Sequence, residues 1–383
     1  MTALSQLVVL SLEPWDDVWR RNQLLVEALS IGLPDLRVLF VEPPLAALRN
    51  FHAGRPPRSA RRSVDRLPGV TALRTVQWTP DRLTPYVPLH SGRAVLRAAK
   101  VLGFDEPVLW VNNHSLARFA LRSGWPIVYD ITDDWLLAGL SPGKRRRAEL
   151  DDQLLLRGAD AVVVCSPALA ASRGVHRDVV VIPNGIDVAH FTTPQPRPDD
   201  LGAGPVVVYV GTLQEERLDV QLCCDIADDL ADVQFVYVGP DCLQAASRYE
   251  LARRANVQLL GPRPYAVVPA YLQHADAIFI PHVVSPFTES LDPIKARECL
   301  AVGTPTVATP IAGFRELGAT IRVATPADFA RELVIALRED RRVAPPADLW
   351  TWTAAGRAFA DVLESINRYR RSSSRSSRRG RDE

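Results

Sequence analysis

The sequence predicts an α/β protein built from two Rossmann-like halves, each with a parallel sheet covered on both faces. At 383 residues the chain is long for one hydrophobic core, which favours two domains. Short β-branched runs alternate with helical patterns along most of the chain, as is typical of parallel strands joined by helices. The alternation stops once, in the proline-, glycine- and acid-rich segment 192–205, and then restarts. That segment is therefore predicted to be the interdomain linker.

Residues 1–191 are predicted to form the N-terminal domain. A helix over Trp19–Ile31 follows the first strand, and a loop rich in arginine lies between Phe51 and Arg66. Each predicted strand is a short apolar run in which β-branched residues dominate. The predicted strands are Leu7–Leu12, Arg37–Val41, Val108–Val111, Ile127–Tyr129, Ala161–Val164 and Val179–Ile182.

Residues 206–345 are predicted to form the C-terminal domain, followed by a helix within 346–370. That helix carries Trp352, Phe359 and Ile366 on or near one face. The last segment, 371–383, has no apolar residue and is predicted to be disordered. The predicted strands of this half are Val206–Val210, Gln234–Val238, Val257–Leu260, Ala277–Ile280, Thr306–Ala308 and Ile321–Ala324.

The composition is that of an ordinary globular protein, with 47% hydrophobic and 23% charged residues. A net charge of +1 gives no reason to expect nucleic-acid binding. The five cysteines form no CxxC pair, so they suggest neither a disulfide framework nor a zinc site and fit a reducing cytosol. Leu7–Leu12 is too short for a signal core or a membrane span. We therefore expect a cytoplasmic protein.

The stretch Thr288–Ala308 reads as a short helix that leads into a buried strand. Asp292 and Pro293 are typical of a helix start. Lys295 places a cation in the first turn, where free N–H groups and the helix dipole favour an anion such as phosphate. Glu298 lies on the same side, where its carboxylate could accept both hydroxyl groups of a ribose. These residues predict a nucleotide-diphosphate pocket; the alternative is a surface ion pair worth roughly a few tenths of a kcal/mol.

Further polar residues follow the strand Val206–Val210, at the strand end where parallel sheets bind ligands. Gly211 and Thr212 come directly after it, and a glycine there lets backbone N–H groups approach a phosphate closely. Arg217 follows five residues later and could bind the phosphate bidentately. The alternative is a solvated arginine among neighbouring acids.

Three carboxylates stand at the end of the strand Ile127–Tyr129. Asp130, Asp133 and Asp134 could bind an acceptor hydroxyl group, act as a base or hold Mg²⁺. The alternative is that Thr132 or Asp133 caps the next helix.

Several motifs together resemble a known family. PNGIDVAHF at Pro183–Phe191, YVGTLQEERLD at Tyr209–Asp219 and TESLDPIKARECLAVGTPTVATP from Thr288 resemble the family 4 retaining glycosyltransferases. YDITDDW at Tyr129–Trp135 and PWDDVWRRNQ from Pro14 fit the branch that includes the teichuronic-acid biosynthesis type. The resemblance covers nearly the whole chain to about residue 345.

The resemblance implies the GT-B fold, in which two Rossmann-like domains face each other and the last helix crosses back to the N-terminal domain. It implies transfer of a sugar from a nucleotide-diphosphate-sugar donor to a hydroxyl acceptor with retention at the anomeric carbon. It also implies that neither a metal nor another cofactor is needed, because basic side chains and a helix N-terminus stabilise the departing charge. Asn184-Gly185 is implied to lie at the interdomain cleft.

The donor-side residues depart from the family pattern at two positions. The family usually has an arginine directly after Gly211 and a lysine five residues later, and this chain has Thr212 and Arg217 in those places. The family's E-x7-E pattern falls on Ser290 and Glu298, so the ribose-binding glutamate is present and the first glutamate is not. Lys295 is expected to supply the phosphate charge missing at position 212, with Pro293 opening its helix.

The acceptor-side residues follow from the same resemblance. His114 is expected to face the transferred sugar; the alternative is a loop histidine beside a helix cap. Asp130 or Asp133 would act on the acceptor, with Asp134 nearby. Trp15 and Arg20 follow the first strand, where the family usually has a glycine-rich loop. Trp15 could stack on a sugar ring, although a half-buried tryptophan is the commoner outcome.

The expected function is that of a hexosyltransferase in cell-surface polysaccharide, glycolipid or secondary-metabolite glycosylation. Basic patches at Lys144–Arg147, Arg55–Arg62 and the tail predict contact with an anionic membrane that presents a lipid-linked acceptor. One alternative, suggested by Thr212 and Ser290, is a catalytically degraded GT-B protein that binds a nucleotide sugar in assembly or regulation. Another is a GT-B nucleotide-sugar epimerase. A dehydrogenase is disfavoured, because no GxGxxG follows any predicted strand.

Overall fold

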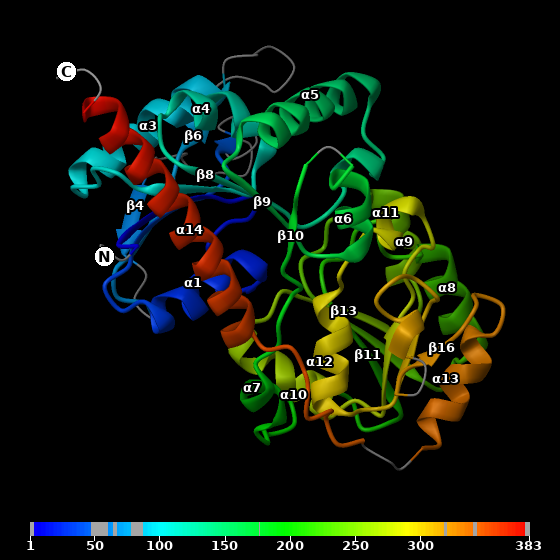
Figure 1. Cartoon of the computed structure of the whole chain (residues 1–383). Coiled ribbons are helices and arrows are strands. Elements are labelled where there is room, and N and C mark those ends of the chain that lie inside the picture. Colours follow the sequence, from blue (N-terminus) through cyan, green and yellow to red (C-terminus); the bar gives the residue numbers. More distant parts are fainter. Residues whose placement is uncertain are drawn as a thin grey trace.

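The computed structural model describes residues 4–46, 60–63, 67–77, 87–175, 177–317, 320–339 and 343–379. The chain forms two α/β halves, coloured blue to green and green to orange in Figure 1. Each half is built on one main sheet with an apolar cluster on each face. The predicted architecture of two parallel, doubly covered sheets is confirmed.

The N-terminal half contains an eight-stranded sheet in the order β10-β9-β8-β7-β1-β2-β5-β4, parallel throughout except for β4 against β5. Along β1, Leu7 and Val9 face α1 and α14, whereas Val8 and Leu10 face the helices on the other side. Burial on both faces explains why this strand is a continuous apolar run. The strands are β1 (Gln6–Leu10), β2 (Arg37–Val41), β4 (Ala60–Ser63), β5 (Val70–Arg74), β7 (Val108–Val111), β8 (Ile127–Ile131), β9 (Ala161–Val164) and β10 (Val180–Val181), with β3 (Leu45–Ala46) and β6 (Val76–Gln77) paired separately. The helices are α1 (Arg21–Gly32), α3 (Val87–Val101), α4 (Ala117–Arg122), α5 (Pro142–Gly158) and α6 (Pro167–Arg173).

The C-terminal half contains a six-stranded, all-parallel sheet in the order β13-β12-β11-β14-β15-β16. Helices α8 and α13 cover one face of it, and α10 and α12 cover the other. The strands are β11 (Val206–Val210), β12 (Gln234–Val238), β13 (Val257–Gly261), β14 (Ala277–Ile280), β15 (Thr306–Ala308) and β16 (Arg322–Val323). The helices are α7 (Val188–Thr192), α8 (Val220–Asp229), α9 (Ala245–Ala252), α10 (Val268–Gln273), α11 (Pro286–Glu289), α12 (Ile294–Val302) and α13 (Phe329–Leu337).

The chain crosses between the halves twice, and the two crossings lie side by side. Ile186 and Thr351 form a parallel bridge, and the Ile186 N–H donates to the Trp350 carbonyl at 3.0 Å. Gly185 has to be small here, because a Cβ atom would collide with the backbone of Thr351 and Trp352. Ile186 packs into the C-terminal core together with Phe191.

The final helix, α14 (Trp352–Arg379), returns to the N-terminal half as predicted and lies against α1 (Figure 1). The Phe359 ring packs 4.6 Å from the Trp110 ring, and Leu363 is fully buried beside it. The helix continues to Arg379, where disorder was predicted from residue 371. Adding residues to an existing helix costs far less free energy than starting one, so a polar sequence without an apolar face can extend it.

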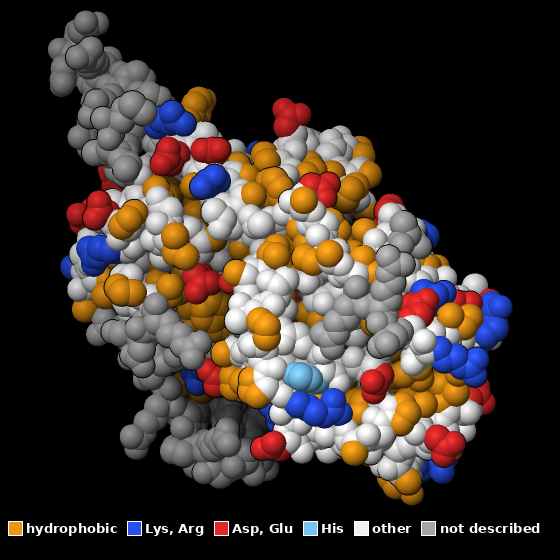
Figure 2. All heavy atoms as spheres, turned by 90° about the horizontal axis from the view of Figure 1, so that it is seen from below, with side chains coloured by type: hydrophobic (Ala, Val, Ile, Leu, Met, Phe, Trp, Pro, Cys, Tyr) orange, Lys and Arg blue, Asp and Glu red, His pale blue; other side chains and the backbone are white. Residues whose placement is uncertain are grey.

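The charged residues are mixed with apolar ones on the surface seen in Figure 2, without a large area of one sign. Of the predicted basic patches, Lys144–Arg147 lies in α5, where Lys144, Arg146 and Arg147 are exposed. Residues 55–59 and 380–383 of the other two lie outside the described residues. In the part of the chain that the structure describes, no helix is both long and apolar enough to cross a bilayer.

Replacing Phe359 with alanine should detach α14 from the N-terminal sheet, because it leaves a cavity against Trp110. The expected loss is about 3–5 kcal/mol in the free energy of unfolding, measured by urea denaturation. Asp361→Ala, at an exposed position of the same helix, is the control and should change stability little. Equal effects of the two substitutions would show that the helix does not hold the domains as described.

Candidate active site between the two domains

The carboxyl ends of strands from both sheets meet where the two halves touch. The loops after β1 and β8 carry Glu13 and Asp133, and β11 and β14 are followed by Gly211 and His282. Arg217, from the loop after β11, donates from Nη2 to Asp133 Oδ1 at 2.8 Å across the domain boundary. Ligands of parallel α/β sheets bind at this edge. The site predicted from the sequence therefore lies at the boundary between the domains.

Helix α12 starts one residue later than predicted, with Pro293 as its N-cap residue. Lys295 is consequently its second residue. Asp292 does not cap the helix; its carboxylate accepts a hydrogen bond from the Asn184 N–H at 2.5 Å and pairs with Arg297 at 2.7 Å. The predicted helix end is confirmed, since Gly303 adopts a left-handed conformation at the C-cap.

Lys295 lies directly against Gly211 at the end of β11. A Cβ atom at position 211 would collide with Cε and Nζ of Lys295, and Gly211 has a φ of +150°, which other residues rarely adopt. The Lys295 ammonium lies 5.6 Å from the centre of the Tyr209 ring. The cation is thus positioned over the backbone that was predicted to approach a phosphate, in keeping with the expectation that it replaces the charge missing at Thr212.

The pKa values of Lys295 and Glu298 are shifted in opposite directions. Burial lowers the pKa of Lys295 to about 8, and the nearby positive charge of Arg217 adds to the effect. Burial raises the pKa of Glu298 to about 7, against the attraction of Lys295. Among the ion pairs of the described residues, none within 4 Å joins Lys295 to Glu298, so the structure does not contain the alternative of a direct pair. Neither side chain is therefore engaged by the other.

Arg217 lies over two neighbouring aromatic rings, with its guanidinium 5.9 Å from the Trp135 ring centre and 5.6 Å from that of Phe287. Its Nε atom is buried and has no hydrogen-bond partner. Trp135 belongs to the N-terminal half and Phe287 to the C-terminal half, and their rings are 5.3 Å apart. Arg217 is therefore positioned by both domains and paired with Asp133, and the alternative of a solvated arginine is wrong.

His282 was not singled out from the sequence, although it follows the predicted strand Ala277–Ile280. It is 2% exposed, its Nε2 atom lies 3.4 Å from the Tyr209 hydroxyl, and its Nδ1 atom has no partner. Burial lowers its pKa well below the ordinary value, and the charges of Lys295 and Arg217 add to this. The neutral His282 imidazole, whose Nδ1 atom has no hydrogen-bond partner, therefore lies near Lys295 and Arg217.

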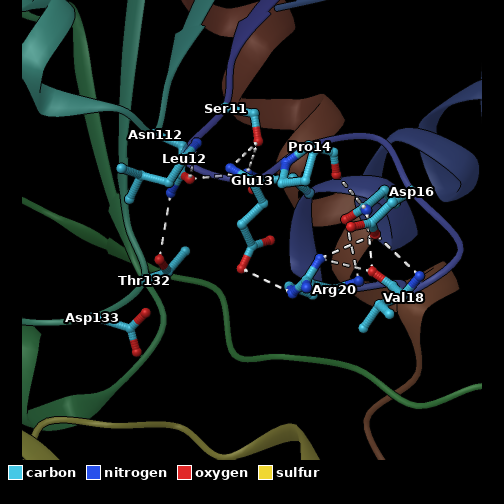
Figure 3. A network of polar contacts seen from close by, with 12 residues as sticks. Ser11, Leu12, Glu13, Pro14, Asp16, Val18, Arg20, Asn112, Thr132 and Asp133 are labelled. Atoms are coloured by element: carbon cyan, nitrogen blue, oxygen red, sulfur yellow. Dashed lines mark hydrogen bonds and ion pairs between the residues drawn. The ribbon is translucent and has the colours of Figure 1, made fainter. Parts of the chain in front are cut away.

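Glu13 was also missed, because a lone glutamate in a loop has no distinguishing pattern. Its side chain pairs with Arg20 at 3.6 Å (Figure 3). Burial raises its pKa to about 7, with Asp133 contributing in the same direction and Arg20 opposing. Arg20, which was predicted to lie on the acceptor side, also forms an ion pair with Asp16 at 3.3 Å.

Asp130 and Asp134 do not reach this site, contrary to prediction. Asp130 is fully buried, pairs with Arg21 at 3.2 Å and accepts a hydrogen bond from the Trp110 indole N–H. Asp134 is 4% exposed and accepts two hydrogen bonds from Arg173, at 2.8 and 3.0 Å. Asp130 and Asp134 each neutralise a buried arginine of their own domain. Of the three acids, Asp133 is the one that pairs with the other domain.

Trp15 and Ser290 are likewise structural. Trp15 is 5% exposed and packs edge-on against Phe40, so it is more deeply buried than the half-buried alternative expected, and little of its ring is open to a sugar. Ser290 is 4% exposed, and its hydroxyl donates to the Phe287 carbonyl at 2.7 Å. The Ser290 carbonyl accepts a hydrogen bond from the Ser166 hydroxyl at 2.6 Å, which joins the domains near the site.

His114 stays a prediction. It is half-buried after β7, and burial lowers its pKa while the charge of Asp152 opposes. Among the described residues, no hydrogen bond or ion pair joins His114 to Arg217 or Lys295.

A polar network ties the site to the crossing at Asn184. Arg21 donates to the Asn184 side-chain oxygen at 3.1 Å, and the Asn184 amide nitrogen donates to the Asp292 carbonyl at 2.6 Å. Asp292 directly precedes the N-cap of α12. Through this network, the buried Arg21–Asp130 pair is linked to the helix that carries Lys295.

Within the described ranges, no group of three or more His, Cys, Asp or Glu side chains is arranged to hold a metal ion. A pocket of about 860 Å³ lies elsewhere in the N-terminal half. It is lined by residues between Gln153 and Asp178 and contains none of the predicted site residues.

Comparison with known proteins shows what the C-terminal half of the chain is similar to. Residues 204–339 match the family described as Glycosyl transferases group 1. The Bacillus subtilis (strain 168) protein named "Putative teichuronic acid biosynthesis glycosyltransferase TuaH" is 28% identical over 222 residues. That alignment covers 52% of this chain and 55% of the relative, so the match spans about half of its length.

The fold is shared with solved glycosyltransferases. Sucrose-phosphate synthase of Thermosynechococcus elongatus superposes with a TM-score of 0.65 at 18% identity, covering 98% of this chain and 100% of that one. Anabaena HepE in complex with UDP-glucose has a TM-score of 0.60 at 17% identity, covering 97% and 99%. The chain therefore has the GT-B fold, and residues 204–339 of its C-terminal half are similar to the group 1 glycosyl transferases.

Asp130→Asn should destabilise the fold, because it leaves the Arg21 charge buried and without its partner. We expect a loss of about 3–5 kcal/mol in the free energy of unfolding, measured by urea denaturation. Asp133→Asn, in the partly exposed pair with Arg217, is the matched control and should lose about 1 kcal/mol or less. A stable Asp130→Asn protein would return Asp130 to the list of site candidates.

Nucleotide binding should have a pH optimum between about 7 and 8. Glu298 becomes a carboxylate as the pH rises through about 7, and Lys295 loses its proton as the pH rises through about 8. Titration calorimetry with UDP should show affinity falling on both sides, and Glu298→Gln should abolish the acid limb only. A flat profile between pH 6 and 9 would contradict the assignment of both groups to the site.

Proposed function

We propose that the chain is a retaining glycosyltransferase that moves a hexosyl group from a nucleotide-diphosphate-sugar donor to a hydroxyl acceptor. One observation carries the proposal. Lys295 lies over Gly211 at the start of α12, its charge acts on Arg217 and Glu298, and all three side chains lie at the domain boundary. Two cations at a helix N-terminus suit a diphosphate, and a carboxylate one turn away suits a ribose.

The proposed reaction proceeds on one face of the sugar. The bond between the anomeric carbon and the diphosphate oxygen breaks while Arg217 and Lys295 neutralise the departing negative charge. The acceptor oxygen then bonds to the same face of that carbon, and its proton leaves with the diphosphate. Closure of the domains over the donor would exclude water and limit its hydrolysis.

We propose further that the reaction needs no metal or other cofactor, because Arg217, Lys295 and the α12 N-terminus provide the positive charge that a metal would otherwise supply. Activity that survives EDTA would support this. His114 is proposed to contact the transferred sugar, and Asp133, with Arg20 nearby, to lie on the acceptor side.

The cellular role is proposed from the named relative and the surface. A place in cell-surface polysaccharide, glycolipid or secondary-metabolite glycosylation is consistent with the name of the Bacillus subtilis protein. Exposed Lys144, Arg146 and Arg147 suit an anionic membrane surface at the cytoplasmic face, where a lipid-linked acceptor could be presented.

A nucleotide panel tests the proposal. UDP, GDP, ADP and dTDP should be compared by thermal shift, and the sugar donors of the nucleotide that binds should then be assayed for slow hydrolysis or transfer. We expect one nucleotide to raise the melting temperature and its sugar donor to be consumed. Binding without any turnover would favour the degraded, nucleotide-binding alternative, and absence of binding would reject the donor site.

Lys295→Ala should reduce donor turnover by roughly 10²-fold and weaken nucleotide binding, because one of the two phosphate-binding cations is removed. Lys100→Ala, an exposed lysine on α3, is the matched control. Lys295→Arg keeps the charge and should restore part of the activity. Unchanged turnover in Lys295→Ala would remove Lys295 from the mechanism.

A further inference from the structure

The helices on one side of the N-terminal sheet carry a large excess of positive charge. Helices α3, α4 and α5 cover one face of this sheet, and α1 and α14 cover the other. They run along the top of the view in Figure 1, the side that is turned away in Figure 2. Together they contain ten basic and three acidic residues, a net charge of +7 in a chain whose net charge is +1. The outer surface of these three helices is called the basic face below. Its basic residues are Arg93, Arg97, Lys100, Arg118, Arg122, Lys144, Arg145, Arg146, Arg147 and Arg157.

The cations of the basic face point away from the sheet and are largely unpaired. Arg93, Arg97 and Lys100 are exposed and recur every three or four residues, so they share the outer side of α3. Two of the three acidic residues, Asp151 and Asp152, are buried. Within the described residues, the ion pairs of the basic face are limited to that between Arg147 and Asp151, at 3.8 Å. The positive charge is therefore not neutralised by the chain itself.

Exposed apolar side chains lie among these cations, and they narrow the kind of partner that fits. Leu96 and Val101 on α3 are 43% and 68% exposed, and Leu150 on α5 is 49% exposed. Leu96 lies between Arg93 and Arg97 in the same helical stripe. Cations alone would suit any polyanion, whereas cations mixed with exposed apolar side chains suit the surface of an anionic bilayer, where the apolar groups enter the headgroup region.

The basic face is continuous with the candidate active site. Arg145, near the start of α5, donates from Nη2 to the Ala138 carbonyl at 3.1 Å. Ala138 ends the short loop that carries Asp133, which pairs with Arg217 of the other domain. Leu137 of this loop is 44% exposed. A bilayer lying against α5 would therefore come close to the loop that borders the site.

We infer that the basic face, formed by α3, α4 and α5 together, is a docking surface for an anionic lipid bilayer, with Leu96, Val101 and Leu150 entering the headgroup region. The inference rests on the proposed function, whose membrane contact it extends from the start of α5 to three helices and to apolar side chains. Each basic residue near an anionic surface strengthens binding roughly fivefold, and salt screens this attraction.

Vesicle flotation with the full-length chain tests the inference. One set of vesicles contains phosphatidylglycerol and phosphatidylcholine in equal parts, and the other contains phosphatidylcholine alone. We expect the chain to float with the anionic vesicles and not with the neutral ones, and added salt to weaken the binding. Heparin, a soluble polyanion, is tested as a competitor in the same experiment.

Removing two cations shows whether the binding uses this face. The double substitution Arg97→Gln and Arg146→Gln should weaken binding to the anionic vesicles about 25-fold. The control is Arg357→Gln with Arg368→Gln, which removes the same charge from exposed positions on α14, on the opposite face of the sheet. It should change the binding little.

Removing two apolar side chains separates a bilayer from other polyanions. Leu96→Asn with Leu150→Asn keeps the charge and should weaken vesicle binding at least about threefold, while leaving heparin binding unchanged. Ile31→Asn, at a 73% exposed position on α1, is the matched control. The melting temperature of each variant shows whether its fold is intact.

Four outcomes would overturn the inference. They are no binding to anionic vesicles, equal binding to both sets of vesicles, an α3–α5 charge variant that loses no more than the α14 variant, or heparin binding together with apolar substitutions that leave vesicle binding unchanged. The last would identify a surface for a soluble polyanion. Failure of the proposed function is recognised separately, since nucleotide binding and donor hydrolysis are measured without vesicles.

Discussion

The arrangement of the two domains depends on close packing at the point where the chain passes between them. Gly185 lies so near the backbone of Thr351 and Trp352 that no side chain fits, and this brings both crossings into one place. Asn184, one residue earlier, receives a hydrogen bond from Arg21 and donates to Asp292. A contact between backbones and a satisfied buried network resist displacement more than surface ion pairs do.

The buried network around Arg21 also determines which acidic residues of the loop after β8 face the candidate site. Arg21 must be neutralised because it is 4% exposed, and Asp130 at the end of β8 does so. Asp133 lies three residues further along, beyond the sheet, and reaches Arg217 of the other domain. The loop after β8 therefore separates a structural carboxylate from one that faces the site, although both belong to the same acidic run.

The charges of the site are divided between the domains. The C-terminal half contributes both cations, Lys295 and Arg217, together with Glu298, and the N-terminal half contributes acids such as Glu13 and Asp133. The shifted pKa values of Lys295, Glu298 and Glu13, at about 8, 7 and 7, arise because burial at the domain boundary weakens the hydration of each charge. A ligand with a negative end and a hydroxyl-rich end would satisfy both sides.

Local sequence was sufficient for the fold class and for most strands, because fully buried parallel strands must be continuous apolar runs; β11 and β12 have the bounds predicted for them. It was also sufficient to place Lys295 and Glu298 near each other on α12, since one helical turn sets that spacing. The weakly apolar β5 could not be found, because its burial comes from pairing with β2. The tertiary structure alone decided that Asp130, Asp134, Trp15 and Ser290 are buried and structural, and that Glu13 and His282 belong to the site. Those outcomes depend on which distant residues meet at the sheet edges, and no local pattern records that.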